Sequence, residues 1–310
     1  MSLGQLRVLL DREDLTPERI ATLTPLEQER LEELRAARAF GTSLGLADST
    51  GYRHLLDRDA DAAVRVVVGA PPDRLEAVSW WFPIVGRVSY RGYFDANRAD
   101  AFAASLAADG YDTLVRPAAL YSTLGWFDDP VPRPVLSWDE IDVVDAGLHE
   151  LVHETIFVRD DLNYNEALAT FLAQEATIAF FADRPELQAQ ARAAFADRVR
   201  FAQLIDDLAI ALEELYERVD SPEAAREARA PVFRRFQTTG FTSRGFETHR
   251  YGAFPELELD NAYVVAQQTY LHELACLRAW FEHEGGDLSS FIAIQRDDPG
   301  ERPELEECQP

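Results

Sequence analysis

The chain of 310 residues has 47% hydrophobic side chains, enough for a substantial core in one large domain or two lobes. Its 55 acidic residues outnumber 30 basic residues, all of them arginine, and give a formal net charge of −25. Such a surface repels a phosphate backbone, so we expect no nucleic-acid partner. We also expect no transmembrane segment, because the chain contains no apolar run of the ~18 residues that a spanning helix needs.

The N-terminal half predicts helices followed by a small sheet. Apolar residues recur at helical spacing over 16–46, where Pro25 is expected to end one helix and begin the next. A further helix is expected over 96–108. Val-rich, aromatic and β-branched segments between turn signals predict strands at 62–71, at 80–94 and, once or twice, within 111–127.

After a Pro-rich break at 130–134, the pattern is helical almost throughout. The Gly- and Thr-rich segment 237–254 predicts a loop that could carry functional groups. The expected fold class is α+β, with a small mixed sheet in the N-terminal half and a largely helical C-terminal half. We expect an N-terminal α+β lobe over 1–118 and a mainly helical lobe over 119–310, together forming one compact unit. The expected helices of the second lobe are 138–158, 163–182, 185–219, 222–236 and 257–284.

Residues 149–153 read His-Glu-Leu-Val-His within one of these helical patterns. Residues four apart share a helix face, so His149 and His153 can bind one metal ion while Glu150 lies beside it. This is the zincin arrangement, in which zinc lowers the pKa of a bound water to about 7 and a carboxylate takes its proton. Zn²⁺ is therefore the expected cofactor and Glu150 the expected general base. The alternative is a pair of surface or hydrogen-bonded core histidines.

A third ligand could come from the longer pattern HExxHxxGxxH or from a glutamate of the following helix. Ile156 and Arg159 stand where that longer pattern requires Gly and His, so it fails. Glu166 lies on the first turns of the next helix, which a short loop could fold back against the first. We expect Glu166 to be the third ligand; the alternative is a helix-start glutamate favoured by the macrodipole.

Hydrolysis of an amide also needs a hydrogen-bond donor for the oxyanion of the tetrahedral intermediate. The candidates are His249 and Tyr251 in the polar loop and Tyr263 at the start of a long helix. Segment 121–127 could be an edge strand that pairs with an extended peptide, or an ordinary strand with aromatic side chains in the core. A second His-Glu pair, beginning at His272, has no evident partner ligand, and we assign it to the surface and core.

Several blocks of sequence accompany the HELVH motif in a fixed order: SYRGYFD at 89–95, YSTLGWFDDPV at 121–131, NEALATF at 165–171, ELDNA at 258–262 and GGDLSSFIA at 285–293. Together they resemble the bacterial predicted aminopeptidases, HExxH zinc metallopeptidases of the Glu-zincin type, over most of the chain. The resemblance implies that His149, His153 and Glu166 are metal ligands and that Glu150 is the catalytic base. It departs from the family at Asp260, where we expect Asn.

We therefore expect a zinc metallopeptidase that hydrolyses peptide or aminoacyl substrates, acting as an aminopeptidase. The alternatives are a non-catalytic, metal-stabilised peptide-binding protein, and an endopeptidase or amide hydrolase that uses the same site. Members of the family commonly begin with a secretory or lipoprotein leader, so the resemblance implies a periplasmic or lipoprotein-anchored place in the cell envelope. The opening MSLGQLRVLLDRED lacks a leader pattern, and a leader could have been removed.

Overall fold

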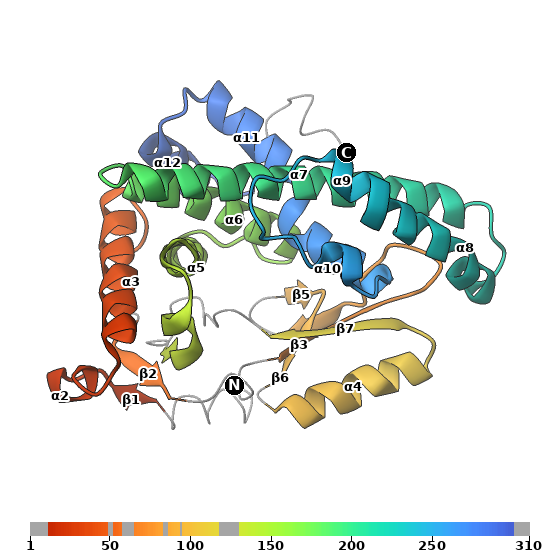
Figure 1. The fold of residues 1–310 in the computed structure, drawn as a ribbon, viewed down its shortest axis with the longest axis horizontal. Helices are drawn as coiled ribbons and strands as arrows, with labels where there is room; N and C mark the ends of the chain where they lie inside the picture. The colour runs from red at the N-terminus through yellow and green to blue at the C-terminus, as the bar shows by residue number, and fades with distance from the viewer. Residues whose placement is uncertain are drawn as a thin grey trace.

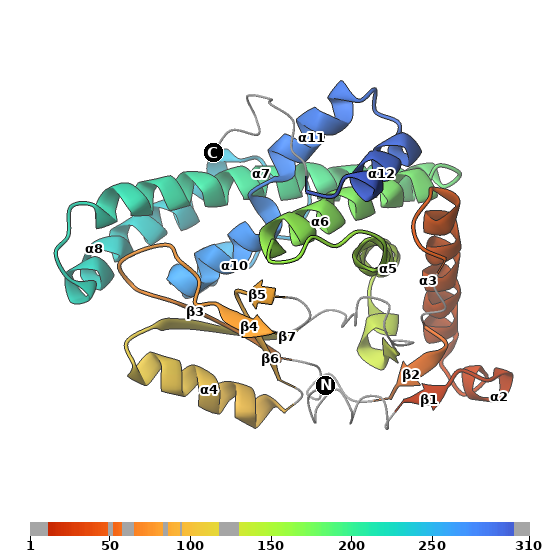
Figure 2. The same ribbon diagram turned by 180° about the vertical axis from the view of Figure 1, so that it is seen from behind.

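The structure, a computed structural model, describes residues 12–48, 52–57, 65–82, 86–93, 95–117 and 130–300. It confirms an α+β chain with small sheets in the N-terminal half and a largely helical C-terminal half. Figures 1 and 2 show the long helix α7 (Pro185–Tyr216) crossing the molecule, with the sheet on one side of it and helices α11 and α12 on the other. None of the described helices combines the length and the apolar character that a bilayer span requires.

The first two helices of the described chain, α2 (Pro17–Ile20) and α3 (Pro25–Ser43), are both capped. Thr24 caps α3 by accepting a hydrogen bond from the Glu27 backbone, and the Glu27 carboxylate accepts one in return from the Thr24 N–H. This capping box satisfies two N–H groups that the helix itself leaves unpaired. The predicted start of a helix at Pro25 is confirmed.

The largest sheet surrounds β3 (Arg65–Ala70), which pairs antiparallel with β6 (Arg91–Tyr93) and β7 (Asp112–Pro117). Helix α4 (Ala96–Ala108) covers one face and α10 (Asn261–Leu271) the other. Successive residues of β3 point to opposite faces, so Val67 packs towards α4 while Val68 packs towards α10. Both faces are buried from Val66 onwards, which explains why β3 carries no polar side chain after Arg65.

Short strands complete the N-terminal half. A hairpin joins β4 (Trp80–Phe82) to β5 (Gly86–Val88), and β2 (His54–Leu56) lies between β1 (Glu13–Asp14) and β8 (Val131–Pro132). The strands predicted within 62–71 and 80–94 are thus confirmed. Of the region 111–127, β7 is confirmed, whereas the candidate edge strand 121–127 lies outside the described residues.

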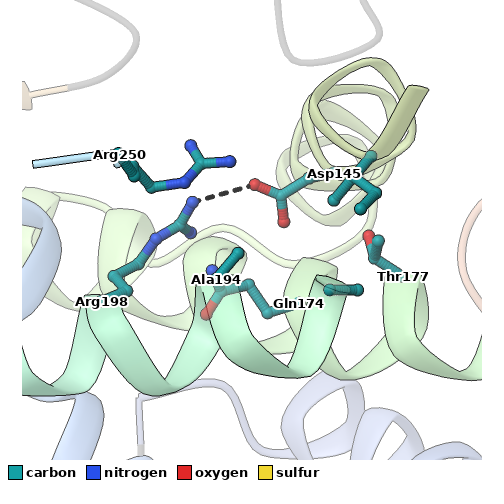
Figure 3. A pocket seen from close by; sticks show the side chains of 8 residues that line it. Asp145, Gln174, Thr177, Ala194, Arg198 and Arg250 are labelled. Carbon is teal, nitrogen blue, oxygen red and sulfur yellow. Dashed lines mark hydrogen bonds and ion pairs between the residues drawn. The ribbon is translucent and has the colours of Figure 1, made fainter. Parts of the chain in front are cut away.

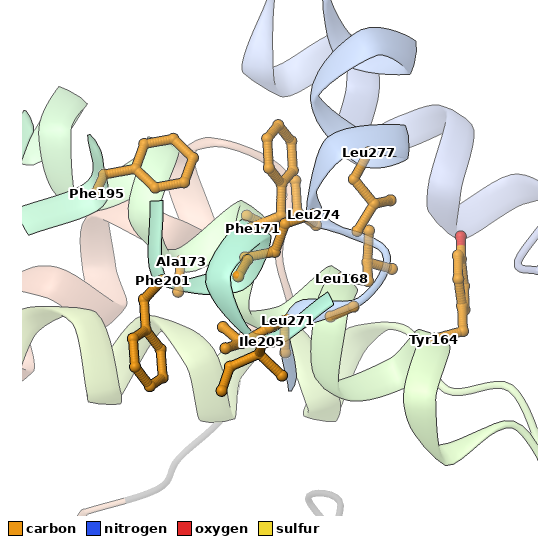
Figure 4. Close-up of a cluster of buried hydrophobic side chains, with 14 of the residues drawn as sticks. Tyr164, Leu168, Phe171, Ala173, Phe195, Phe201, Ile205, Leu271, Leu274 and Leu277 are labelled. Carbon is orange, nitrogen blue, oxygen red and sulfur yellow. The ribbon is translucent and has the colours of Figure 1, made fainter. Parts of the chain in front are cut away.

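The helical half follows a 3₁₀ turn at Arg133–Ser137 and is centred on α6 (Leu162–Phe180), which is buried around almost its whole circumference. Figure 4 shows part of the core around it, where Leu168 and Phe171 of α6 meet Phe195 and Ile205 of α7. A helix buried on all sides makes α6 the centre of this core. The other helices are α5 (Glu140–Thr155), α8 (Pro222–Arg235), α9 (Phe241–Ser243), α11 (Leu274–His283) and α12 (Leu288–Asp297).

Two expected elements differ from the structure. The single helix expected over 257–284 is divided into α10 and α11, because Glu273 leaves the helical backbone conformation (φ −93°, ψ 5°). The apolar residues on the two sides of this break meet different surroundings, because α10 packs against both the sheet and the helical core, whereas α11 packs against the helical core. The loop expected over 237–254 begins with helical structure, since a π-helical turn at Phe236–Gly240 continues α8 into α9. The division of the chain at residue 118 stays a prediction.

A buried polar hub joins α10 to the sheet and to two other helices. Asn261 donates to the Pro71 carbonyl (2.8 Å) and accepts a hydrogen bond from the Tyr216 hydroxyl of α7 (2.7 Å). Asp112 of β7 accepts from the Asn261 N–H (3.2 Å) and from Arg229 of α8 (3.0 Å). Buried polar groups are costly unless they are paired, and here each satisfies another. The ELDNA block therefore has a structural role at Asn261.

Asp260, which caps α10, predicts how stability depends on pH. Its carboxylate accepts from the Tyr263 N–H (2.9 Å), and burial raises its pKa from 3.8 to about 6. The folded protein therefore binds this proton more tightly than the unfolded chain, so the stability that the group contributes falls as pH rises from about 4 to about 6. Asn also caps helices but does not titrate. We expect Asp260→Asn to gain stability over the wild type across that window, by at most about 3 kcal/mol.

Urea unfolding at about pH 4 and about pH 7 measures this gain. The matched control is Asp287→Asn at the exposed cap of α12, where hydrogen bonds from Ser290 lower the pKa of the aspartate. Its pH dependence should have the opposite sign. The prediction would be contradicted if the free energy of unfolding changed with pH in the same way in the wild type and in Asp260→Asn.

Candidate metal centre

The C-terminal part of α5 presents the HExxH residues. Leu148, Leu151 and Val152 are fully buried and hold one side of the helix in the core. His149 and His153 lie one turn apart on another side and remain partly exposed, as does Glu150. The helix thus has a fixed position, while its imidazoles remain open to a ligand.

The loop between α5 and α6 brings Glu166 back towards the histidines. Asn165 fixes this loop with two hydrogen bonds to Val158, one to its N–H (2.8 Å) and one to its carbonyl (2.7 Å). Asp161 caps α6 by accepting a hydrogen bond from the Tyr164 N–H (3.2 Å). Glu166, on the first turns of α6, is only 6% exposed. Asn165 of the NEALATF block therefore positions the glutamate that follows it.

The β4–β5 hairpin holds the same loop from the other side. The Arg87 N–H donates to Asp160 Oδ1 (2.8 Å). Gly86 has φ +79°, and a Cβ atom there would lie 2.0 Å from this carboxylate oxygen. Only glycine combines that backbone conformation with so close an approach.

His149, His153 and Glu166 converge in space. The two Nε2 atoms are 3.1 Å apart, and Glu166 Oε2 lies 3.3 Å from that of His149 and 3.5 Å from that of His153. We refer to these three residues as the triad. Each offers one ligand atom to a common point, so the triad could hold a metal ion.

The charges of the site depend on one another. Burial raises the pKa of Glu166, but the charges and hydrogen bonds of His153 and His149 outweigh it and leave that pKa well below its usual range. Burial lowers the pKa of His153, yet Glu166 outweighs it and the net shift is upward. For Glu150, burial raises the pKa more than the two histidines lower it. Glu150 is thus a stronger base than an exposed glutamate.

Two arginines support α5 from neighbouring helices. Arg38 of α3 donates to both oxygens of Glu154, the residue after His153, at 3.2 and 2.9 Å, and both side chains are buried. Arg198 of α7 donates to Asp145 (3.1 Å), one turn before His149. Figure 3 shows the side chains of Arg198 and Arg250 next to Asp145. The cavity beside them measures about 10 Å³, which is too small for a substrate.

The three residues expected to stabilise the oxyanion have packing partners of their own or are exposed. Tyr251 stacks on Phe201 with ring centres 4.1 Å apart, and Tyr263 packs near Phe254. His249 is exposed. Within the described residues, none of the three is hydrogen-bonded to the triad. Their role in catalysis stays a prediction.

Sequence reasoning missed three residues near the site: Tyr90, Arg116 and Tyr270. The charges of Glu166 and Glu150 contribute to raising the pKa of both tyrosines, after burial itself, while Arg116 lowers both. One signal was available for Tyr270: it follows Ala262 and Ala266 at helical spacing, and those two alanines face the sheet. Tyr90 lies in the SYRGYFD block, and no pattern in that block indicates which way its side chain points.

Removing Arg38 should destabilise the protein, because the Glu154 carboxylate would remain buried without a partner. For Arg38→Met we expect a loss of about 3–5 kcal/mol in the free energy of unfolding, measured in urea. Arg218→Met is the control, since Arg218 and Glu214 form an exposed pair 3.4 Å apart. There the loss should stay below about 1 kcal/mol. Equal losses in both variants would show that the buried pair has no special importance.

The triad also makes a prediction about metal content. We expect the wild type to retain about one divalent ion per chain after dialysis and elemental analysis. The double variant His149→Ala, His153→Ala should lose it. A control double variant, His272→Ala with His283→Ala, removes two histidines outside the triad and should keep the wild-type content. No bound metal in the wild type, even after supply of the ion, contradicts the prediction.

Comparison with known proteins agrees with this picture. A family model described as "Putative aminopeptidase" matches residues 2–300. No curated protein matches the chain, and no solved structure does. The matched range includes α5, α6 and the whole sheet with β3 at its centre. The chain therefore belongs to the family described as "Putative aminopeptidase".

Proposed function

We propose that the chain is a zinc-dependent aminopeptidase of the zincin type in which Glu150 is the general base. The observation that carries the proposal is the convergence of His149, His153 and Glu166 beside Glu150. Two imidazoles and one carboxylate are a ligand set of catalytic zinc sites, which keep a further position for water or substrate. His149, with 19% of its side chain exposed, leaves the triad accessible.

The separations within the triad suit zinc. Ligand atoms ~2.0–2.2 Å from a tetrahedral zinc ion lie roughly 3.3–3.5 Å apart. The three separations here are 3.1, 3.3 and 3.5 Å. The triad therefore needs little movement to hold the ion, which supports zinc as the cofactor.

Zinc, when bound, lowers the pKa of a water molecule to about 7 and polarises the substrate carbonyl. Glu150 accepts a proton from the attacking water as the water oxygen bonds to the carbonyl carbon. It then donates that proton to the nitrogen of the leaving amine as the C–N bond breaks. The products are a carboxylic acid and an amine, so water is the one co-reactant. The raised pKa of Glu150 favours the first transfer, because it makes the carboxylate a stronger base.

A second cavity offers room for the N-terminal end of a substrate. It measures about 180 Å³ and includes Ser89, Asp160, Asp161 and Asn163 in its lining. Asn163 precedes Glu166 by three residues on α6, so the two share a helix face. A free α-ammonium group would be attracted by the two aspartates. This supports an exopeptidase, in agreement with the family description.

Glu150→Gln tests the mechanism. The amide cannot accept the proton, so we expect kcat to fall by about 10²–10⁴-fold while zinc content stays at the wild-type level. The control is Glu140→Gln at the start of the same helix, which should keep both zinc and activity. The substrates are short peptides with either a free or an acetylated N-terminus, and only the free form should be cleaved.

Each result has a distinct meaning. Full activity in Glu150→Gln would rule out the general-base role. Cleavage of the acetylated peptide would indicate an endopeptidase on the same triad. Zinc binding without turnover of any peptide or simple amide would instead support a non-catalytic, metal-stabilised binding protein.

A further inference from the structure

The small cavity shown in Figure 3 lies where α5, α6 and α7 meet. It measures about 10 Å³, and its wall consists of these three helices and the loop that follows α9. Its polar lining comes from Asp145 of α5, Gln174 and Thr177 of α6, Arg198 of α7 and Arg250 of the loop. A space of this size holds about one water molecule and nothing larger.

Two polar atoms of this wall are unpaired. Asp145 Oδ1 and Thr177 Oγ1 are buried, and neither makes a hydrogen bond within the part of the chain that the structure describes. Thr177 is only 2% exposed, so bulk water does not reach its hydroxyl. Figure 3 shows this hydroxyl directed towards α5, the helix that carries Asp145. A buried polar atom without a partner costs free energy, so these two atoms indicate a ligand that binds both.

The other polar groups of the cavity already bind partners. Arg198 donates to Asp145 Oδ2 (3.1 Å). In the amide orientation that turns its oxygen towards Arg198, Gln174 accepts a hydrogen bond from the Arg198 Nε atom (2.9 Å). Arg250 forms an ion pair with Asp142 of α5. One carboxylate oxygen and one hydroxyl are therefore the groups that a ligand would bind.

The charges of the wall favour a neutral ligand. A carboxylate oxygen repels an anion, and the guanidinium groups of Arg198 and Arg250 repel a cation. A carboxylate accepts hydrogen bonds only, whereas the Thr177 hydroxyl can donate or accept. We propose that the cavity binds one water molecule, which donates a hydrogen bond to Asp145 Oδ1 and accepts one from the Thr177 hydroxyl.

This water joins the two helices that carry the triad. Asp145 lies four residues before His149 on α5, and Thr177 lies eleven residues, about three turns, after Glu166 on α6. The water thus adds a polar connection near the C-terminal end of α6, whereas the triad lies near its start. Since the site needs only the packing of three helices, it does not depend on the proposed peptidase function.

Two measurements detect the water. A high-resolution crystal structure of the wild type should show an isolated density peak within about 3.2 Å of both Asp145 Oδ1 and Thr177 Oγ1. Oxygen-17 magnetic relaxation dispersion counts the waters held inside a protein in solution, and Thr177→Val should lower this count by one. Thr177→Ser keeps the hydroxyl and should keep the count. The matched control is Thr269→Val, since Thr269 is also buried but its hydroxyl already donates to the Val265 carbonyl (3.1 Å).

The urea midpoint of Thr177→Val gives an independent test, because a bound water and a dry cavity predict opposite signs. If water binds both atoms, the substitution removes a hydrogen bond, and the midpoint should fall by about 0.5 M. If the hydroxyl is buried without a partner, the valine methyl group replaces an unsatisfied polar atom, and the midpoint should rise.

Three results would overturn the proposal. The first is a rise in the midpoint of Thr177→Val, or an unchanged count of internal waters in that variant. The second is a crystal structure in which the Thr177 hydroxyl donates to the carbonyl of Ala173, four residues earlier, with no density in the cavity. The third is a peak whose oxygen contacts are too short for hydrogen bonds, which indicates a cation. Because the crystal structure uses the wild type, it decides the question even if a variant fails to fold.

Discussion

The site depends on one buried carboxylate, that of Glu166 on α6, whose charge is compensated by side chains of α5. A buried carboxylate is stable only when it is paired, and here the partners are two imidazoles from one face of α5. Everything that fixes α5 and α6 relative to each other therefore also fixes the triad. Asn165 binds the intervening loop, Arg38 holds Glu154, and Arg198 holds Asp145.

This arrangement pairs two acidic residues of α5 with arginines of neighbouring helices. Each supporting pair joins α5 to a different helix, α3 through Arg38 and α7 through Arg198. Because these arginines also pack their stems against the surrounding helices, a substitution there changes both charge and packing. The histidines thus remain partly exposed, while another side of α5 is closed by the core. A site with one open side is what a substrate needs in order to reach a catalytic ion.

The sequence predicted the parts of the fold that depend on local patterns. Helical spacing identified α5 and α6, the spacing of four between His149 and His153 predicted a shared face, and the short loop predicted the return of Glu166. It did not single out Tyr90, Arg116 or Tyr270, because their packing depends on how α10 lies on the sheet. The break at Glu273 was missed for a related reason, since apolar periodicity does not tell which layer a face will meet.

The hub at Asn261 joins residues 190 positions apart in sequence, from Pro71 to the start of α10. During synthesis, which proceeds from the N-terminus, the sheet around β3 and the triad are made well before α10 emerges. Until then, one face of the sheet is uncovered, and Asp112 lacks the Asn261 N–H that it binds in the complete fold. The nascent chain consequently contains all three residues of the triad before it can complete the buried polar hub, so the hub is among the last parts of the fold to form.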